Sequence, residues 1–217
     1  MKDVVKINHG PNGFERDYSK YNYKSSRRHH VPTWDEYKKV LSEKIEDSRL
    51  YYLIRLGHEL GISPYAVVNL RKIHFCSMQP RSIFVEVAKS IKRFKKSAPV
   101  MRSRLLPIND SLYAGLKEYI KTHDSKYLVP NKKGYNCLTV CRICQMFQSE
   151  GIGWTPHKSR SFFKNQMKTV LIPLGMYDEG EVRKIMGHQP RDSGERYDDL
   201  NFELACLYVN KVFAERL

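Results

Sequence analysis

The spacing of apolar and polar residues predicts a mainly helical chain from residue 33 onward. Thr33 and Glu36 have the positions of a capping box, in which each side chain binds the backbone of the other, at the start of a helix over 34–47. An apolar helix should follow over 50–60 and end at Gly61, because glycine tolerates the left-handed backbone of a helix end. The same spacing predicts further helices over 64–70, 112–120, 137–149, 158–170 and 202–213.

A β pattern interrupts the helices between residues 82 and 108. β-branched and aromatic residues predict a strand over 82–88, and 104–108 is its expected antiparallel partner. A long basic connection joins the two segments. The expected fold class is therefore α+β, mainly α, with a small β-sheet and no internal repeat.

The first 31 residues show neither a helical nor a strand period. Glycine, proline, tyrosine and basic residues predominate there, including Arg27 and Arg28, and we expect a flexible basic arm over 1–31. Such a mixture suits phosphate contacts and base stacking, although an ordinary disordered tail has the same composition. The compact domain should then occupy 32–217.

Composition narrows the class of protein. The 217 residues include 38 Lys and Arg against 23 Asp and Glu, a net charge of +15, which exceeds the magnitude of about 2–8 typical of a small domain. A field of that sign attracts polyanions, so nucleic acid is the expected partner. No apolar run is long enough to span a membrane, and five cysteines are too few for a disulfide framework. We therefore expect a cytoplasmic protein with reduced thiols.

Three cysteines have a spacing that can hold an iron–sulfur cluster. Cys137, Cys141 and Cys144 form a C-x3-C-x2-C pattern. They also fall on one face of the predicted helix over 137–149, whose other apolar residues would bury them. We interpret them as buried free thiols and predict no metal site.

The last third of the chain carries the more informative pattern. His157 and Arg160 lie at i and i+3 where a helix should begin, so both should share one face. Arginine binds phosphate through a permanently charged fork, and histidine can donate or carry a proton. A Gly187-His188 pair follows, and Tyr197 comes nine residues after His188.

These residues, in this order, resemble the tyrosine recombinase family, which is also called lambda-integrase-like. Its signature is a His-x-x-Arg box, a Gly-His at the end of a short helix, and a nucleophilic tyrosine at this distance. The resemblance covers roughly residues 31–213. It implies the family's catalytic-domain fold and the cutting and rejoining of DNA.

Residue roles follow from the resemblance. It makes Tyr197 the nucleophile that attacks a DNA phosphodiester, leaving a 3′-phosphotyrosyl bond and a free 5′-hydroxyl. His157, Arg160 and His188 would hold and neutralise the phosphate. The family's catalytic lysine, which protonates the leaving oxygen, fits Lys89 best. The alternatives for that lysine are Lys92 and Lys96.

The resemblance further implies double-stranded DNA and a homo-tetramer as partners, a DNA-associated location in the cytoplasm, and no metal or other cofactor. Solvated basic side chains more often contact the phosphates of the DNA backbone than act as catalytic groups. The expected DNA-binding residues are Lys92, Lys95, Lys96, Arg102, Arg71, Arg27 and Arg28.

One departure from the family pattern affects the predicted site. The segment 61–71 aligns with the family's first box without a gap, but the catalytic arginine falls on Ser63 and the usual glutamate on Ala66. Ser63 instead has the position of an N-cap before Pro64. Arg55 or Arg71 would have to supply the missing charge.

Three hypotheses remain open. The first is an active site-specific recombinase that integrates, excises or inverts DNA. The second is a catalytically inactive DNA-binding regulator on the same fold, for which the missing arginine is the main support. The third is an unrelated RNA-binding or transcription module, which would make the spacing of His157, Arg160, His188 and Tyr197 accidental.

Overall fold

The computed structural model describes residues 30–76, 81–89, 100–134, 136–187, 200–214 and 216, without the side chains of 44, 76, 86–89 and 100–103. Most of the predicted arm lies outside these residues. So do the following residues with an expected role: Arg27, Arg28, Lys92, Lys95, Lys96, His188 and Tyr197.

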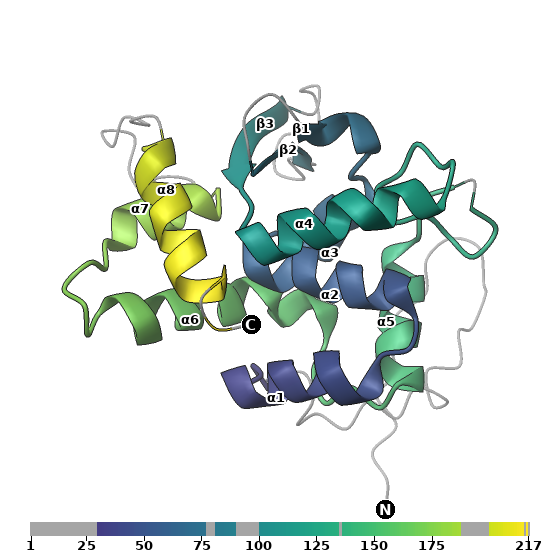
Figure 1. The fold of residues 1–217 in the computed structure, drawn as a ribbon, viewed down its shortest axis with the longest axis horizontal. Helices are drawn as coiled ribbons and strands as arrows, with labels where there is room; N and C mark the ends of the chain where they lie inside the picture. The colour runs from purple at the N-terminus through teal and green to yellow at the C-terminus, as the bar shows by residue number, and fades with distance from the viewer. Residues whose placement is uncertain are drawn as a thin grey trace, which may run out of the picture.

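The described chain is mainly helical, as the pattern predicted, with a small sheet at one edge (Figure 1). The α-helices are α1 (Trp34–Lys39), α2 (Ser48–Leu60), α3 (Pro64–Val68), α4 (Asp110–Tyr119), α5 (Val140–Ser149), α6 (Ser159–Leu171), α7 (Glu179–Ile185) and α8 (Phe202–Val209). Short 3₁₀ turns occupy Lys72–His74, Ile120–Thr122 and Pro156–Lys158, and π-helical turns extend α1 over Val40–Lys44 and α8 over Asn210–Ala214.

The local capping chemistry acts as predicted. Thr33 and Glu36 form the capping box, with Thr33 N donating to Glu36 Oε2 at 2.7 Å. Gly61 ends α2 at a φ of 62°, and Ser63 caps α3 by accepting from Ala66 N at 3.3 Å. The α1 segment stops at residue 44 rather than 47, because Asp47 accepts from Arg49 N and caps α2 instead.

The sheet has one strand more than the pattern predicted. Its order is β1-β2-β3, formed by β1 (Phe75–Cys76), β2 (Ser82–Lys89) and β3 (Val100–Pro107), and all neighbours are antiparallel. The predicted partner strand therefore begins at residue 100, four residues early, because it pairs with the full length of β2. In this register Ile83 lies opposite Leu106 and Val85 opposite Arg104.

The structure corrects the interpretation of the cysteines. Helix α5 begins at Val140, after the N-cap Thr139, so Cys137 precedes the helix and its backbone bridges Pro130 instead. Cys141 is exposed, which contradicts the expected burial of all three thiols. No group of three potential metal ligands occurs among the described residues.

Helix α2 lies at the centre of the core. Its buried face packs on α6, and an aromatic cluster continues the core toward α1 and the C-terminus, with Tyr37 and Phe162 at 4.7 Å and Phe163 and Phe213 at 5.7 Å between ring centroids. Figure 1 shows α7 and α8 side by side at one end of this helical body. None of the helices described here has the length and apolar content needed to cross a bilayer.

A buried histidine ties α2 to the loop before α6. His58 Nδ1 donates to Ile54 O at 2.9 Å, and Trp154 Nε1 donates to His58 Nε2 at 3.1 Å. This pattern requires the neutral ring, because Nε2 acts as an acceptor. Burial lowers the pKa of His58 to about 4.

The His58 contact predicts a pH-dependent stability. Between about pH 6.5 and pH 4 the unfolded histidine binds a proton and the folded one does not, so stability falls as pH falls through this window. From pH 7 to pH 5 this group should remove about 2 kcal/mol from the free energy of unfolding. Urea unfolding of wild type and of His58→Gln at both pH values measures this change in the free energy of unfolding. An equal pH dependence in both proteins would contradict the assignment.

Candidate functional site

The predicted phosphate-binding pair lies at the start of α6. His157 is exposed in the 3₁₀ turn Pro156–Lys158, and Arg160 is half-buried in the first turn of α6. Ser159, between them, is buried and donates from Oγ to Ile62 O at 2.9 Å. This bond fixes the start of α6 against the segment that leads into α3.

Among the described residues, a backbone carbonyl and no carboxylate holds Arg160. Its Nη2 donates to Met186 O, and its Nε is buried without a hydrogen-bond partner among the described residues. Burial lowers the pKa of Arg160 below its ordinary value. Because that ordinary value is very high, the guanidinium still stays charged at neutral pH. A half-buried cation with an unused donor is suited to an anionic ligand such as phosphate.

Helix α7 brings its C-terminal end beside Arg160. Lys164 of α6 donates to Glu179 Oε1 at 2.5 Å, and Tyr177 also donates to Glu179. The Lys164 and Tyr177 hydrogen bonds lower the pKa of Glu179 to about 2. Because α7 is anchored on α6 in this way, its end at Met186 meets the Arg160 side chain, with Gly187 following at a φ of 63°.

Ser63 lies near this site but brings no charge to it. It is the residue after Ile62, whose carbonyl accepts from Ser159, and Ser159 directly precedes Arg160. The Ser63 hydroxyl is engaged as the cap of α3, and Ala66 is buried beneath it. The position that the resemblance gives to an arginine is thus close to Arg160 and neutral.

Arg55 does not replace the missing cation. It forms a two-point ion pair with the buried carboxylate of Glu59, at 2.6 Å from Nε and 3.1 Å from Nη2. Burial acts to lower the pKa of Arg55, but Glu59 outweighs it and raises that pKa above its ordinary value. Tyr37 and Asn109 donate to the same carboxylate at 2.7 and 2.5 Å. Arg55 therefore neutralises a buried carboxylate in the core.

The other predicted residues are spread along the fold. Arg71 is exposed before a 3₁₀ turn, where its backbone bridges Tyr127. Lys89 is the last residue of β2, opposite Val100, so it ends the strand rather than lying in the turn beyond it. Arg102 lies in β3 opposite Val87. His188 directly follows Gly187 in the chain, and it lies outside the described residues together with Tyr197.

The sequence interpretation missed Arg104. In the structure its guanidinium covers Gly187, where an added Cβ would lie 2.5 Å from Arg104 Cζ and closer still to Nη1. Strand alternation was the available signal, since Arg104 lies two residues before the buried Leu106 on the same face of β3. Its partner Gly187 could not be found from the pattern, because the two residues are 83 positions apart in the chain.

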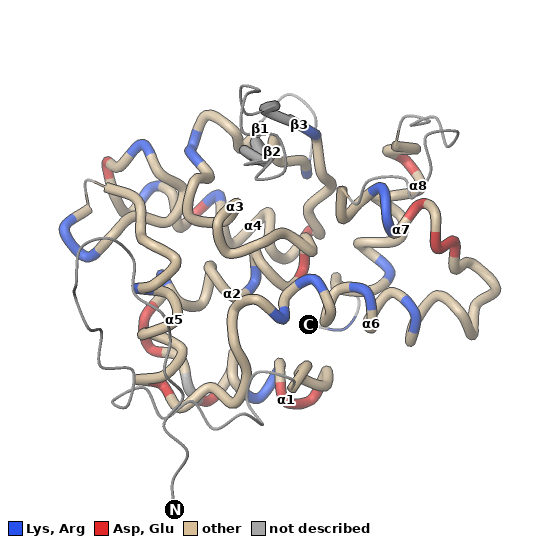
Figure 2. Tube along the Cα trace, turned by 180° about the vertical axis from the view of Figure 1, so that it is seen from behind, with Lys and Arg blue, Asp and Glu red and all other residues tan. Residues whose placement is uncertain are grey.

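Basic residues recur along α6 (Figure 2). Arg160, Lys164 and Lys168 are spaced four apart and so follow one face of the helix. Glu179 offsets the two lysines, at 2.5 Å from Lys164 and 3.9 Å from Lys168. Arg160 is the cation of this row for which the described residues provide no carboxylate.

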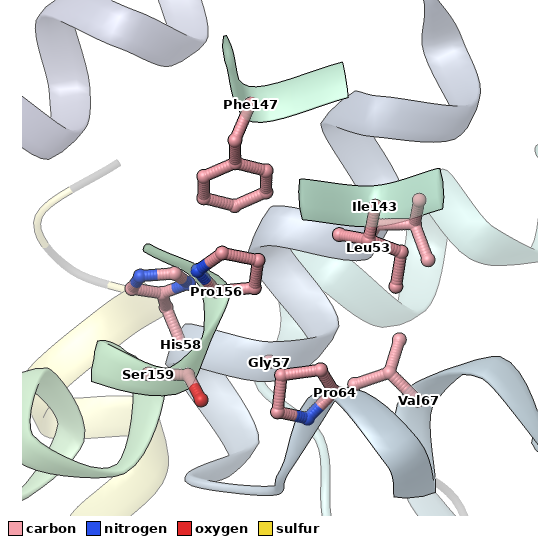
Figure 3. A pocket seen from close by; sticks show the side chains of 9 residues that line it. All are labelled: Leu53, Gly57, His58, Pro64, Val67, Ile143, Phe147, Pro156 and Ser159. Carbon is pink, nitrogen blue, oxygen red and sulfur yellow. The ribbon is translucent and has the colours of Figure 1, made fainter. Parts of the chain in front are cut away.

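A separate small hollow lies between α2, α3, α5 and the start of α6 (Figure 3). Apolar side chains such as Leu53, Val67 and Phe147 form much of its lining. Two polar groups that face it, His58 and the Ser159 hydroxyl, are already engaged with protein partners. The hollow therefore belongs to the packing behind Arg160 and offers no group for catalysis.

Neither a protein-family model nor a curated protein sequence matches the chain. Solved structures do. The XerA recombinase aligns with a TM-score of 0.56 at 18% identity, over 75% of this chain and 57% of that one. A lambda integrase dimer bound to a COC′ core site aligns at 0.56 and 14%, over 81% and 63%. The lambda integrase catalytic core aligns at 0.54 and 15%, over 81% and 99%.

The extent of these alignments defines what is shared. The chain spans about three-fifths of the XerA and DNA-bound lambda integrase chains, and it matches nearly the whole of the isolated catalytic core. At identities of 14–18% the likeness concerns the arrangement of helices and strands. This chain has the fold of the tyrosine recombinase catalytic domain.

Proposed function

We propose that the protein is a site-specific DNA recombinase that cuts and rejoins DNA through a 3′-phosphotyrosyl intermediate. The observation that carries the proposal is Arg160, a half-buried cation that binds the carbonyl of Met186 and whose Nε has no partner in the described part of the chain. That carbonyl lies two residues before His188, which the family pattern assigns to the same phosphate. The fold of the tyrosine recombinase catalytic domain supports the same chemistry.

The proposed reaction exchanges one phosphodiester for another. The Tyr197 oxygen gives its proton to water and attacks phosphorus. The bond from phosphorus to the 5′ oxygen breaks, and that oxygen takes a proton from Lys89. Arg160, His157 and His188 stabilise the negative charge on the non-bridging oxygens as the new bond forms. The reverse attack by a 5′-hydroxyl rejoins the strand and releases Tyr197.

Double-stranded DNA is the proposed substrate. The net charge of +15 favours a polyanion, and a lambda integrase of the same fold has been solved on a COC′ core site. A homo-tetramer on DNA, located in the cytoplasm with the genome, follows from the family pattern. Integration, excision and inversion would all use the same strand-exchange chemistry.

A catalytically inactive DNA-binding regulator is the second candidate. The structure favours it at one point, because Ser63 caps α3 and Ala66 is buried where the family pattern has an arginine and a glutamate. Loss of one fixed donor on a developing charge costs about 10²–10³ in rate. Such a loss would leave binding to DNA largely intact.

Covalent trapping distinguishes the two candidates. The protein is incubated with nicked duplexes from its own genetic neighbourhood, so that the released strand end diffuses away and the intermediate accumulates. We expect a DNA–protein adduct that survives denaturation, with the modified peptide containing Tyr197. Duplexes that the protein binds in a salt-sensitive manner without forming an adduct would instead support the inactive regulator.

A further inference from the structure

We propose that Arg104 provides the second fixed cation on the scissile phosphate, in place of the arginine that is absent at Ser63. The inference rests on the proposed function, since it assigns a further catalytic residue to that reaction. Neither Arg55 nor the Ser63 position supplies this charge, because Arg55 is paired with Glu59 and Ser63 caps a helix.

Strand β3 directs Arg104 toward the site. Arg104 lies opposite the buried Val85 and two residues before the buried Leu106, on the inner face of the sheet. Helix α8 packs against β3 and α7 against α8, so the end of β3 and the end of α7 belong to one packed region. A charged side chain on this inner face is unusual, because the neighbouring residues that strand alternation places there are apolar.

Gly187 allows the close approach of the Arg104 side chain. A Cβ at this position would overlap the guanidinium, at 2.5 Å from Cζ and closer to Nη1. The φ of 63° also favours glycine. Two independent features therefore require glycine directly before His188, and one of them is space for Arg104.

Arg104 and Arg160 meet at consecutive residues. Arg160 donates to the carbonyl of Met186, and Arg104 lies against the Cα of Gly187. Adjacent Cα atoms are about 3.8 Å apart, so the two guanidiniums contact the same turn. An anion beside this turn would therefore be attracted by two positive side chains at once.

The chemistry of the two groups fits a phosphate. A guanidinium group can present paired donors to the non-bridging oxygens of a phosphate, and arginine keeps its charge at neutral pH. The Nε and Nη1 atoms of Arg104 are shielded from solvent, which strengthens their attraction for charge that develops nearby. Arg104 would thus act where the negative charge of the transition state grows.

The test compares strand cleavage by Arg104→Ala and by wild type at saturating protein on a nicked duplex. The rate of adduct formation should fall by about 10²–10³. Arg104→Lys keeps a charge and should recover part of this loss, while Arg104→Gln should not. The control is Arg81→Ala, an exposed arginine next to the same sheet that pairs with Asp110 at 2.8 Å, and its rate should match wild type.

A neutral substrate separates a catalytic from a structural role. A methylphosphonate at the scissile position replaces one charged oxygen with a methyl group, so a cation has less charge to stabilise. The difference between wild type and Arg104→Ala should shrink to less than about tenfold on this substrate. A purely structural role would leave the difference unchanged.

The outcomes distinguish this inference from the proposed function. Arg104→Ala and Arg104→Gln variants that cleave within about threefold of wild type would overturn the role of Arg104 alone, as would a penalty that persists on methylphosphonate. A wild-type protein that forms no adduct on DNA it binds would overturn both. Unfolding curves and DNA affinity of each variant show whether a slow variant is folded and bound.

Discussion

Replacing Tyr197 with phenylalanine should abolish the covalent adduct and leave DNA affinity within about twofold of wild type. Phenylalanine retains the ring and removes only the hydroxyl, so the proposed nucleophilic oxygen is lost while the proposed phosphate contacts of Arg160 and of the other basic residues remain. The measurements are denaturing electrophoresis of the trapped complex and a binding isotherm at fixed salt. This is the largest change expected from a single atom in the protein.

A matched tyrosine controls for the loss of a phenol. Tyr113 is half-buried on α4, where its ring stacks on Phe75 at 5.0 Å between centroids. Tyr113→Phe should therefore form the adduct at the wild-type rate. An adduct that persists in Tyr197→Phe would assign the nucleophile to another residue, and the mapped peptide would identify it.

Replacing Arg55 with methionine should lower the free energy of unfolding by about 3–5 kcal/mol. Methionine fills much of the arginine volume but leaves the carboxylate of Glu59, which is 0% exposed, without its cation. Tyr37 and Asn109 still donate to that carboxylate, and neither carries a compensating charge. Urea denaturation of both proteins at pH 7 measures the difference.

Two further variants test whether the buried charge is the cause. The double variant Arg55→Met, Glu59→Leu removes both charges and should recover part of the lost stability. Lys39→Met breaks an exposed pair with Glu43 of 3.9 Å and should change stability by less than about 1 kcal/mol. A single Arg55→Met variant as stable as wild type would show that Arg55 is dispensable in the core and would reopen its candidacy for the site.

Local chemistry made most of the helices predictable. The ends of α1, α2 and α3 follow from Thr33 with Glu36, from Gly61, and from Ser63, because capping residues act on the backbone within three or four positions. The mixed α+β class followed from the change of period after residue 82. The early start of β3 and the two-residue strand β1 did not, since pairing with β2 decided both.

The candidate site was predictable only in part. His157 and Arg160 are three residues apart, so helical geometry alone places them at the same helix start. The missing arginine at Ser63 was also visible in the sequence. Arg104, which we propose as its substitute, was not visible there. The sequence interpretation considered only arginines near Ser63 in the chain, namely Arg55 and Arg71.

Most helices, the positive charge and the His157–Arg160 pair follow from the sequence alone, since each depends on neighbours within a few residues or on composition. Only the tertiary structure shows which groups each arginine contacts. Packing placed Arg55 against the buried Glu59, brought Met186 to Arg160, and laid Arg104 over Gly187. These contacts join segments from different helices and strands, and their energies come from burial and from close approach that only the folded chain provides.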